Sequence, residues 1–208
     1  MADASNPIPE NNQNKALLRQ ELRQRRRALS PPQQAQASAL LLRHLLQFSA
    51  FMRGRHVALY IANDGEIDPG PIAQRLWQMG KRCYLPVLHP SKVRELWFVE
   101  FTPNTTLIPN HFGIPEPDHR HAHKMPAHIL DVVLMPLVGF DRRGARLGMG
   151  GGFYDTTFAF KQQKPASKPV LIGLAHSCQE VESLSADNWD IPLAAIATEK
   201  EVLQIQPL

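Results

Sequence analysis

Short runs of consecutive apolar residues alternate along this chain with segments of helical spacing, and this alternation constrains the fold more than any other feature. Apolar runs lie at 56–62, 82–87, 95–101, 131–140, 168–175 and 194–198. Strands that are apolar on both faces are typical of a parallel sheet with helices on each side. The sequence therefore predicts an α/β fold with three layers, α/β/α, around one mostly parallel sheet.

Two helices are predicted before the first strand. Leucines recur at helical spacing from Lys15 to Leu29, with arginines between them. Ser30 and Pro31 are typical of a helix start, and an alanine- and leucine-rich segment follows at 34–48. Residues 1–14 carry neither the basic start nor the apolar run of a secretory signal, so we expect a disordered tail there. Residues 15–208 are expected to form a single domain.

Composition limits the class of protein. With 43% hydrophobic and 20% charged residues in 208, the chain resembles soluble globular proteins, and no apolar run approaches a membrane span. Cys83 and Cys178 make neither a disulfide framework nor a zinc set, and we interpret them as reduced structural thiols. These features predict a cytoplasmic protein without a membrane partner. The net charge of +4 permits either nucleic acid or an anionic small molecule.

A glycine-dense segment, ARLGMGGGFYD at 145–155, follows the most apolar predicted strand. Ligands bind at the carboxyl ends of strands in such sheets. Glycines let backbone N–H groups converge on an anion, and a helix that starts directly afterwards adds its positive end. Arg142, Arg143 and Arg146 add charge, and Asp155 is a suitable Mg²⁺ ligand. The segment predicts binding of a nucleoside triphosphate with magnesium; a tight structural turn is the alternative.

The longer stretch GFDRRGARLGMGGGFYD closely resembles the signature of the 5-formyltetrahydrofolate cyclo-ligase family, roughly G-x-D-x-x-G-x-R-L-G-x-G-x-G-[YF]-Y-D, and every fixed position matches. Other segments agree in order. Lys15 and Arg19 match the basic first helix of the family, DGEID supplies Glu66, FGIPEP supplies Phe112 and WDIPL supplies Asp190. The resemblance covers the chain from about Lys15 to its C-terminus.

The resemblance implies that the protein uses ATP and Mg²⁺ to convert 5-formyltetrahydrofolate into 5,10-methenyltetrahydrofolate, with release of ADP and phosphate. The reaction is implied to pass through a phosphorylated formyl intermediate, and the folate could carry one glutamate or several. The residues implied to bind ATP are Lys15, Arg19, Arg146, Leu147, Gly148, Met149, Gly150, Gly151, Gly152, Phe153 and Tyr154. Those implied to bind the folate are Ile61, Glu66, Phe112, Gly148, Gly150 and Gly152. Arg146 and Tyr154 are implied to be catalytic, and Asp155 and Asp190 to bind magnesium.

Several residues keep a plainer interpretation. Lys15 and Arg19 could be solvated helix charges, Glu66 and Asp190 could be turn carboxylates, and Phe112 could belong to the core. The three arginines at 25–27 lie outside the matched motif, and we predict solvated surface positions for them, with a contact to a folate glutamate tail as the alternative.

Two further patterns suggest other functions. His119, His121 and His123 alternate as zinc ligands on a strand would, but their polar, proline-flanked surroundings favour a solvated loop. The arginine-rich first helix raises the alternative of an RNA-associated protein, although no RNA-binding motif accompanies it and we expect no nucleic-acid partner. A phosphosugar or coenzyme A enzyme on a similar fold is a third possibility, which leaves the folate-type segments unexplained.

Overall fold

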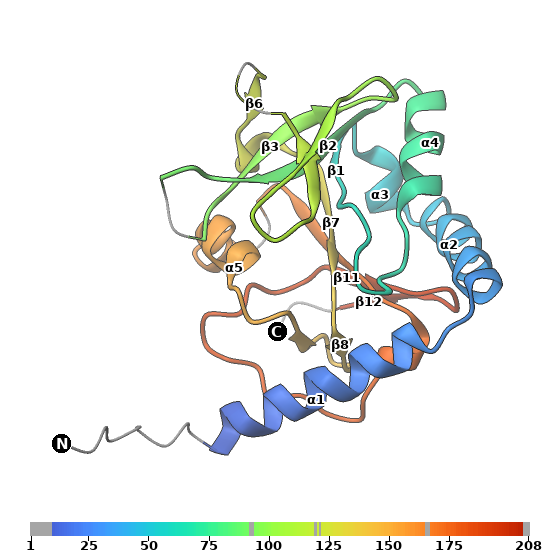
Figure 1. The fold of residues 1–208 in the computed structure, drawn as a ribbon, viewed down its shortest axis with the longest axis vertical. Coiled ribbons are helices and arrows are strands. Elements are labelled where there is room, and N and C mark those ends of the chain that lie inside the picture. Colours follow the sequence, from blue (N-terminus) through green and yellow to red (C-terminus); the bar gives the residue numbers. More distant parts are fainter. Residues whose placement is uncertain (1–9, 92–93, 119, 121, 165–166, 206–208) are drawn as a thin grey trace.

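One central sheet organises the molecule in this computed structural model, which describes residues 10–91, 94–118, 120, 122–164 and 167–205 (Figure 1). Within these residues the sheet has eight strands in the order β12-β11-β10-β7-β1-β2-β3-β6. Strands β11, β10, β7, β1 and β2 run parallel, whereas β12, β3 and β6 pair antiparallel at the two edges. The mostly parallel sheet predicted from the apolar runs is therefore confirmed.

Each of the six predicted apolar runs overlaps a strand of the sheet. The sheet strands are β1 His56–Ala58, β2 Arg82–Leu88, β3 Leu96–Phe101, β6 Lys124–Met125, β7 Val132–Pro136, β10 Val170–Leu174, β11 Ala195–Ala197 and β12 Val202–Gln204. Two small hairpins stand apart from it, β4 Leu107–Pro109 with β5 Pro115–Pro117, and β8 Gly139–Phe140 with β9 Arg146–Leu147. The first run, expected to be a strand over 56–62, leaves the sheet after Ala58.

The helices are α1 Glu10–Arg27, α2 Pro31–Leu45, α3 Ser49–Arg53, α4 Gly70–Gln78 and α5 Phe153–Thr157, with 3₁₀ turns η1 Ala127–Ile129, η2 Ala159–Gln162 and η3 Ser177–Gln179. The predicted start of α2 is confirmed, because the Ser30 N–H donates to Gln33 Oε1 at 2.8 Å and Pro31 is the first helical residue. Helix α1 begins at Glu10 rather than at Lys15, so residues 10–14, which were expected to lie in a disordered tail, are helical. The prediction missed them because they are polar and give no apolar spacing from which a helix could be recognised.

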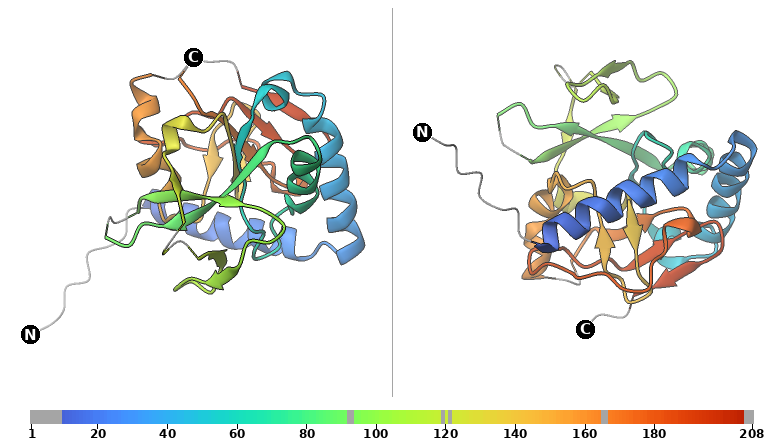
Figure 2. Two further views of the ribbon diagram at one scale, coloured as in Figure 1. Left: turned by 90° about the horizontal axis from the view of Figure 1, so that it is seen from above. Right: turned by 60° about the horizontal axis from the view of Figure 1, so that its bottom comes forward.

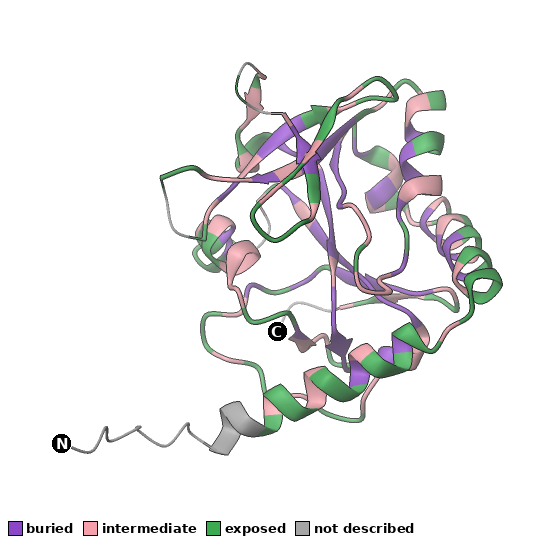
Figure 3. Ribbon diagram, in the orientation of Figure 1, coloured by how far each residue is buried: buried purple, intermediate pink, exposed green. Residues whose placement is uncertain are grey.

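Helices cover the two faces of the sheet unequally. One face packs against buried side chains of α2, α3 and α4, among them Leu41, Phe51 and Ile72. The other face packs against Phe158 and partly buried aromatic residues of α5 and η2. The buried residues therefore concentrate along the central strands and under α2 and α4 (Figure 3). Both cysteines are free, and burial raises the pKa of the Cys83 thiol to about 12, as suits a structural thiol.

Helix α1 lies across the end of the sheet instead of on a face (Figures 1 and 2). Leu22 packs against Val138, which follows β7, and against Leu147 of β9. Both Leu22 and Arg26 of α1 are fully buried. The helix thus closes the carboxyl ends of the central strands, where a ligand is expected in this class of sheet.

Gly139 allows α1 to pack closely on the segment after β7. Its replacement by alanine is expected to lower the free energy of unfolding by about 2 kcal/mol, because the neighbouring core side chains must move to admit the added methyl group. A β-carbon on Gly139 would lie 2.4 Å from Leu22 Cδ1. Urea denaturation measures the loss. In a double-mutant cycle, Leu22→Ala should make room for the methyl and recover part of it. Strictly additive losses would show that Leu22 is not the obstructing contact.

Within the described residues, no helix combines the length and the apolar character needed to cross a membrane.

Candidate active site

The glycine segment forms an open loop between β9 and α5. Gly150 and Gly152 have φ values of 90° and 68°, in the left-handed region that favours glycine. A β-carbon on Gly148 would meet nothing within 4 Å. No acceptor among the described residues pairs with the N–H groups of Gly148, Gly150, Gly151 or Gly152. Because unpaired amides favour an anion, the loop offers a ready phosphate-binding surface.

Helix α1 brings two cations to this loop. Arg19 Nε donates to the Gly148 carbonyl oxygen at 2.8 Å, and a β-carbon on Gly150 would lie 3.6 Å from the same guanidinium. Lys15 Nζ forms an ion pair with Asp187 Oδ2 at 2.6 Å. Lys15 and Arg19 are one helical turn apart and therefore share a face of α1, from which Arg19 contacts the glycine loop and Lys15 contacts Asp187. Their placement supports the predicted site.

Arg146 and the two predicted magnesium ligands form a second group beside the loop. Arg146 donates to Asp155 Oδ1 and to the Ile191 carbonyl oxygen, and its side chain is 8% exposed. The Ile191 N–H also donates to Asp155 Oδ1, at 3.3 Å. Asp190 precedes Ile191 and accepts the Asp187 N–H at 2.8 Å. Asp155 and the nearly buried Arg146 thus form an ion pair where the loop leads into α5, and Asp190 adjoins this pair through the backbone of the next residue, Ile191.

A network of arginines lies farther along α1. Arg26 Nε donates to the Asp64 carbonyl oxygen at 2.8 Å, and its Nη2 donates to Asp64 Oδ2 at 3.0 Å. Arg23 and Arg27 pair with the same carboxylate. Burial raises the pKa of Asp64, but the hydrogen bonds from the three arginines outweigh it and leave the pKa below its ordinary value. Asp64 therefore stays ionised at neutral pH.

Glu66 is enclosed between this network and two tyrosines. Its Oε1 lies 3.6 Å from Arg26 Nη2, and its Oε2 accepts the Asn63 N–H at 3.1 Å. Burial raises the pKa of Glu66 from 4.5 to about 7, although the charge of Arg26 opposes the rise. Burial, together with the charge of Glu66, also raises the pKa values of Tyr60 and Tyr154. Tyr154 consequently remains a protonated phenol, able to donate a hydrogen bond.

The model of the 5-formyltetrahydrofolate cyclo-ligase family matches residues 11–199, which include every residue of both groups. The chain belongs to this family. It is 42% identical over 181 residues to the 5-formyltetrahydrofolate cyclo-ligase of Escherichia coli K12, over 87% of this chain and 98% of that protein. Identity to the Haemophilus influenzae cyclo-ligase is 41%, over 88% and 96% of the two chains. The solved structure of Aquifex aeolicus 5,10-methenyltetrahydrofolate synthetase superposes with a TM-score of 0.78 at 29% identity, covering 93% and 94% of the two chains.

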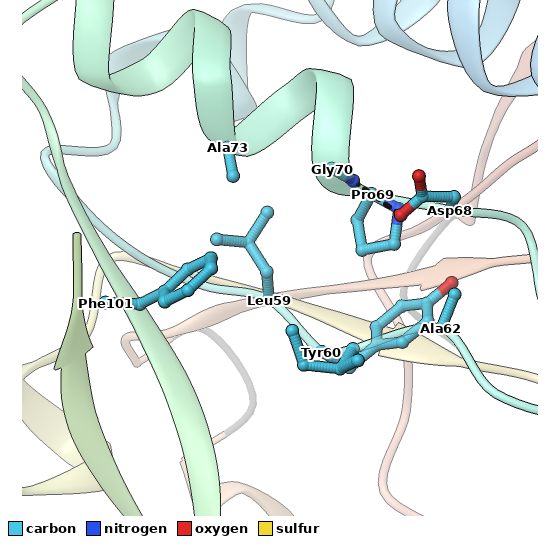
Figure 4. A pocket seen from close by; sticks show the side chains of 9 residues that line it. Leu59, Tyr60, Ala62, Asp68, Pro69, Gly70, Ala73 and Phe101 are labelled. Carbon is cyan, nitrogen blue, oxygen red and sulfur yellow. Dashed lines mark hydrogen bonds between the residues drawn. The ribbon is translucent and has the colours of Figure 1, made fainter. Parts of the chain in front are cut away.

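Two further residues that the cyclo-ligase resemblance suggested, Phe112 and Ile61, lie in different places. Phe112 is 57% exposed at the tip of the β4–β5 hairpin, so the interpretation as a core residue is wrong. Its ring meets Phe153 edge to face, with centroids 6.2 Å apart, which places it beside the glycine loop. Ile61 lines a cavity of about 290 Å³ between the end of β1 and the start of α4 (Figure 4). Leu59, Tyr60 and Phe101 line the same cavity.

The prediction of a solvated surface at 25–27 is wrong for Arg26. Its side chain is 0% exposed, because it follows Leu22 by one helical turn and falls on the face of α1 that packs against the sheet. Arg25 and Arg27 remain about half exposed. Neither His119 nor His121 lies within the described residues, and His123 is exposed.

Sequence reasoning missed three residues of this candidate site. Asp187 pairs with Lys15 from a distant part of the chain, and Asp64 gathers the arginines of α1. Arg94 lies beside the loop, with its Cδ 3.9 Å from the position of a β-carbon on Gly152. Of these three, only Asp64 could have been found, since it is the first residue of the matched segment DGEID.

Proposed function

We propose that this chain converts 5-formyltetrahydrofolate into 5,10-methenyltetrahydrofolate at the expense of ATP. The observation that carries the proposal is the open glycine loop, whose amides are unpaired among the described residues, whose Gly148 carbonyl binds Arg19 and which lies between Arg146 and its partner Asp155. Membership of the cyclo-ligase family supplies the substrate class. Peptide amides and arginine together suit a triphosphate, which neither would hold as well alone.

Phosphate binding requires an exchange of partners. Lys15 is held by Asp187, and Arg146 is held by Asp155 and by the Ile191 carbonyl. An incoming triphosphate competes with these carboxylates for the two cations, while the glycine amides need no such release. The site is thus pre-assembled and neutralised by its own acidic residues before the nucleotide arrives.

Asp155 and Asp190 would hold the magnesium ion. Mg²⁺ usually takes one or two carboxylates together with substrate phosphates, and this pair beside an anion-binding loop fits that donor set. Within the described residues, no group of three His, Cys, Asp or Glu side chains is arranged to bind a metal, so the phosphates would complete the site. When bound, the ion would neutralise charge on the transferred phosphoryl group.

The chemistry follows from a poor leaving group. The formyl oxygen of the amide attacks the γ-phosphorus of ATP, the bond to the ADP oxygen breaks, and the oxygen becomes part of an iminium phosphate. The 10-nitrogen then attacks the activated carbon and loses its proton, the C–O bond breaks, and phosphate leaves. Such transfer needs positioning and charge stabilisation more than a protein nucleophile. Arg146 would stabilise the transferred charge, and the Tyr154 phenol would donate a hydrogen bond.

Folate recognition is assigned to Glu66, Phe112 and Ile61. The Glu66 carboxylate would accept hydrogen bonds from pterin N–H groups in a buried site, where an acceptor of this kind is selective. The exposed ring of Phe112, next to Phe153, is placed to stack on the substrate beside the loop. Ile61 would contribute apolar contact from the end of β1.

A single assay tests the proposal. The protein is mixed with Mg-ATP and 5-formyltetrahydrofolate, and the near-ultraviolet absorption of the methenyl product is followed together with phosphate release. We expect both signals in a 1:1 ratio, and only when ATP and folate are present together. Phosphate release that does not depend on the folate would contradict the proposal. Salt-sensitive RNA binding without turnover would favour the RNA-associated alternative.

A further inference from the structure

We propose that Arg26 is a positioning residue for folate binding, which fixes the loop at 63–67 and holds the Glu66 carboxylate at the substrate. This inference rests on the proposed function, since it assigns a task to the surroundings of the folate-binding group. Arg26 itself reaches the substrate only through Glu66.

The contacts of Arg26 join three separate segments. From α1 its Nη1 donates to the Leu137 carbonyl oxygen at 3.2 Å, directly after β7. Its Nε and Nη2 donate to Asp64, and the same Nη2 lies 3.6 Å from Glu66 Oε1. A planar guanidinium can make all these contacts at once, whereas a single ammonium group cannot.

The loop that Arg26 binds needs external support. Asp64 has a φ of 55° and Gly65 a φ of 75°, so two successive residues occupy the left-handed region. That conformation is unfavourable for a residue with a side chain, and it persists where surrounding contacts determine it. Arg26 supplies such contacts to both the backbone and the side chain of Asp64. The backbone conformation at 64–65 in turn sets the direction in which Glu66 leaves the loop.

The charges around Glu66 make Arg26 its principal counter-charge. Arg26 and Arg23 face it from α1, Asp64 from its own loop, Tyr60 from the segment after β1 and Tyr154 from α5. His176, after β10, lies near Arg26, and burial lowers its pKa, so it is neutral. Without the Arg26 guanidinium, the pKa of Glu66 would rise further, and the carboxylate would be protonated at neutral pH.

The experiment compares Arg26→Met, Arg26→Lys and the control Arg25→Met, which changes a half-exposed arginine paired with Glu21. For Arg26→Met we expect the KM for 5-formyltetrahydrofolate to rise about tenfold or more, with kcat and the KM for ATP changed less than about threefold. The pH midpoint of kcat/KM for the folate should move upward by about one unit. Arg26→Lys retains the charge, so its midpoint should stay near that of the wild type while its folate KM rises. Arg25→Met should match the wild type in each measurement.

A folded Arg26→Met protein with wild-type folate KM and pH midpoint would overturn the inference. If Arg26→Met fails to fold, Arg26→Lys decides, because an unchanged folate KM in that variant would show that the loop does not depend on the guanidinium geometry. Failure of the proposed function is distinguished by the wild-type protein, which would then show no folate-dependent turnover at all.

Discussion

Replacement of Arg146 by alanine is expected to lower kcat by about 10³-fold while the protein remains folded. A fixed arginine that stabilises charge on a transferred phosphoryl group contributes rate factors of this size. Arg146 is suited to that task because its nearly buried side chain is fixed by Asp155 and by the Ile191 carbonyl at the edge of the glycine loop. Alanine also leaves Asp155 without its cation, so magnesium affinity should change in the same variant.

Steady-state kinetics with saturating ATP and folate measure this effect, and circular dichroism verifies folding. Arg142→Ala is the matched control. Arg142 comes from the same signature but is exposed and pairs with Glu180 and Glu201, away from the loop, so its removal should change kcat less than about twofold. Arg146→Lys should recover little activity, because lysine cannot form the paired hydrogen bonds. A fully active Arg146→Ala enzyme would remove this residue from the mechanism.

Replacement of Glu66 by glutamine is expected to stabilise the folded protein at pH 8 by about 3 kcal/mol. The folded-state pKa of about 7 lies above the ordinary value of 4.5, so the native protein favours the protonated carboxyl. The stability contributed by that proton is complete below pH 4.5 and is lost as the pH rises to about 7. The corresponding free energy is about 3 kcal/mol. Glutamine does not ionise and avoids this loss.

Chemical denaturation of both proteins between pH 4 and pH 8 measures this stability effect. The two stabilities should coincide near pH 4 and diverge as the pH rises. A difference that does not vary with pH would mean that Glu66 is not destabilised by burial.

The same substitution should weaken folate binding. An amide offers one acceptor where the carboxylate offers two, so the KM for 5-formyltetrahydrofolate should rise at least about tenfold. The KM for ATP should stay within about twofold, because the hydrogen bond and the ion pair of Glu66 are to Asn63 and Arg26 and not to the glycine loop, Lys15 or Arg19. A gain in stability with loss of substrate affinity would show that the buried charge is retained for function. An unchanged folate KM would remove Glu66 from substrate recognition.

The centre of the fold and the glycine loop could be predicted because both are encoded locally. The continuous apolar runs at 132–136 and 170–174 indicate buried strands without any knowledge of their partners, and both are strands in the structure. The glycines at 150 and 152 occupy left-handed positions, which glycine adopts readily. The β4–β5 hairpin was not predicted, since its prolines obscure strand character. The pairing of Lys15 with Asp187 joins residues far apart in the sequence, and no local pattern indicates it.

Helical spacing places Arg26 on the same face of α1 as the buried Leu22, but its charge led to the prediction of a solvated position. Lys15, Arg19, Leu22 and Arg26 follow one another at intervals of four, three and four residues, which places them on one face of α1. Because three of these four residues are charged, the stripe does not look like a buried face, and Arg26 was expected in solvent. Of the four, Leu22 and Arg26 are fully buried, and the Arg26 cation is stable there because the Leu137 and Asp64 carbonyl oxygens and the Asp64 carboxylate accept its hydrogen bonds.

One continuous helix reaches both the glycine loop and the Glu66 loop, and this has a consequence for how the enzyme can evolve. Arg26 follows Arg19 by seven positions, which corresponds to about 10 Å along α1. Inserting or deleting a single residue between them would turn one contact about 100° away from its partner. Surface loops can therefore vary in length among descendants of this protein, whereas the number of residues between Arg19 and Arg26 is fixed by the distance between the glycine loop and the Glu66 loop.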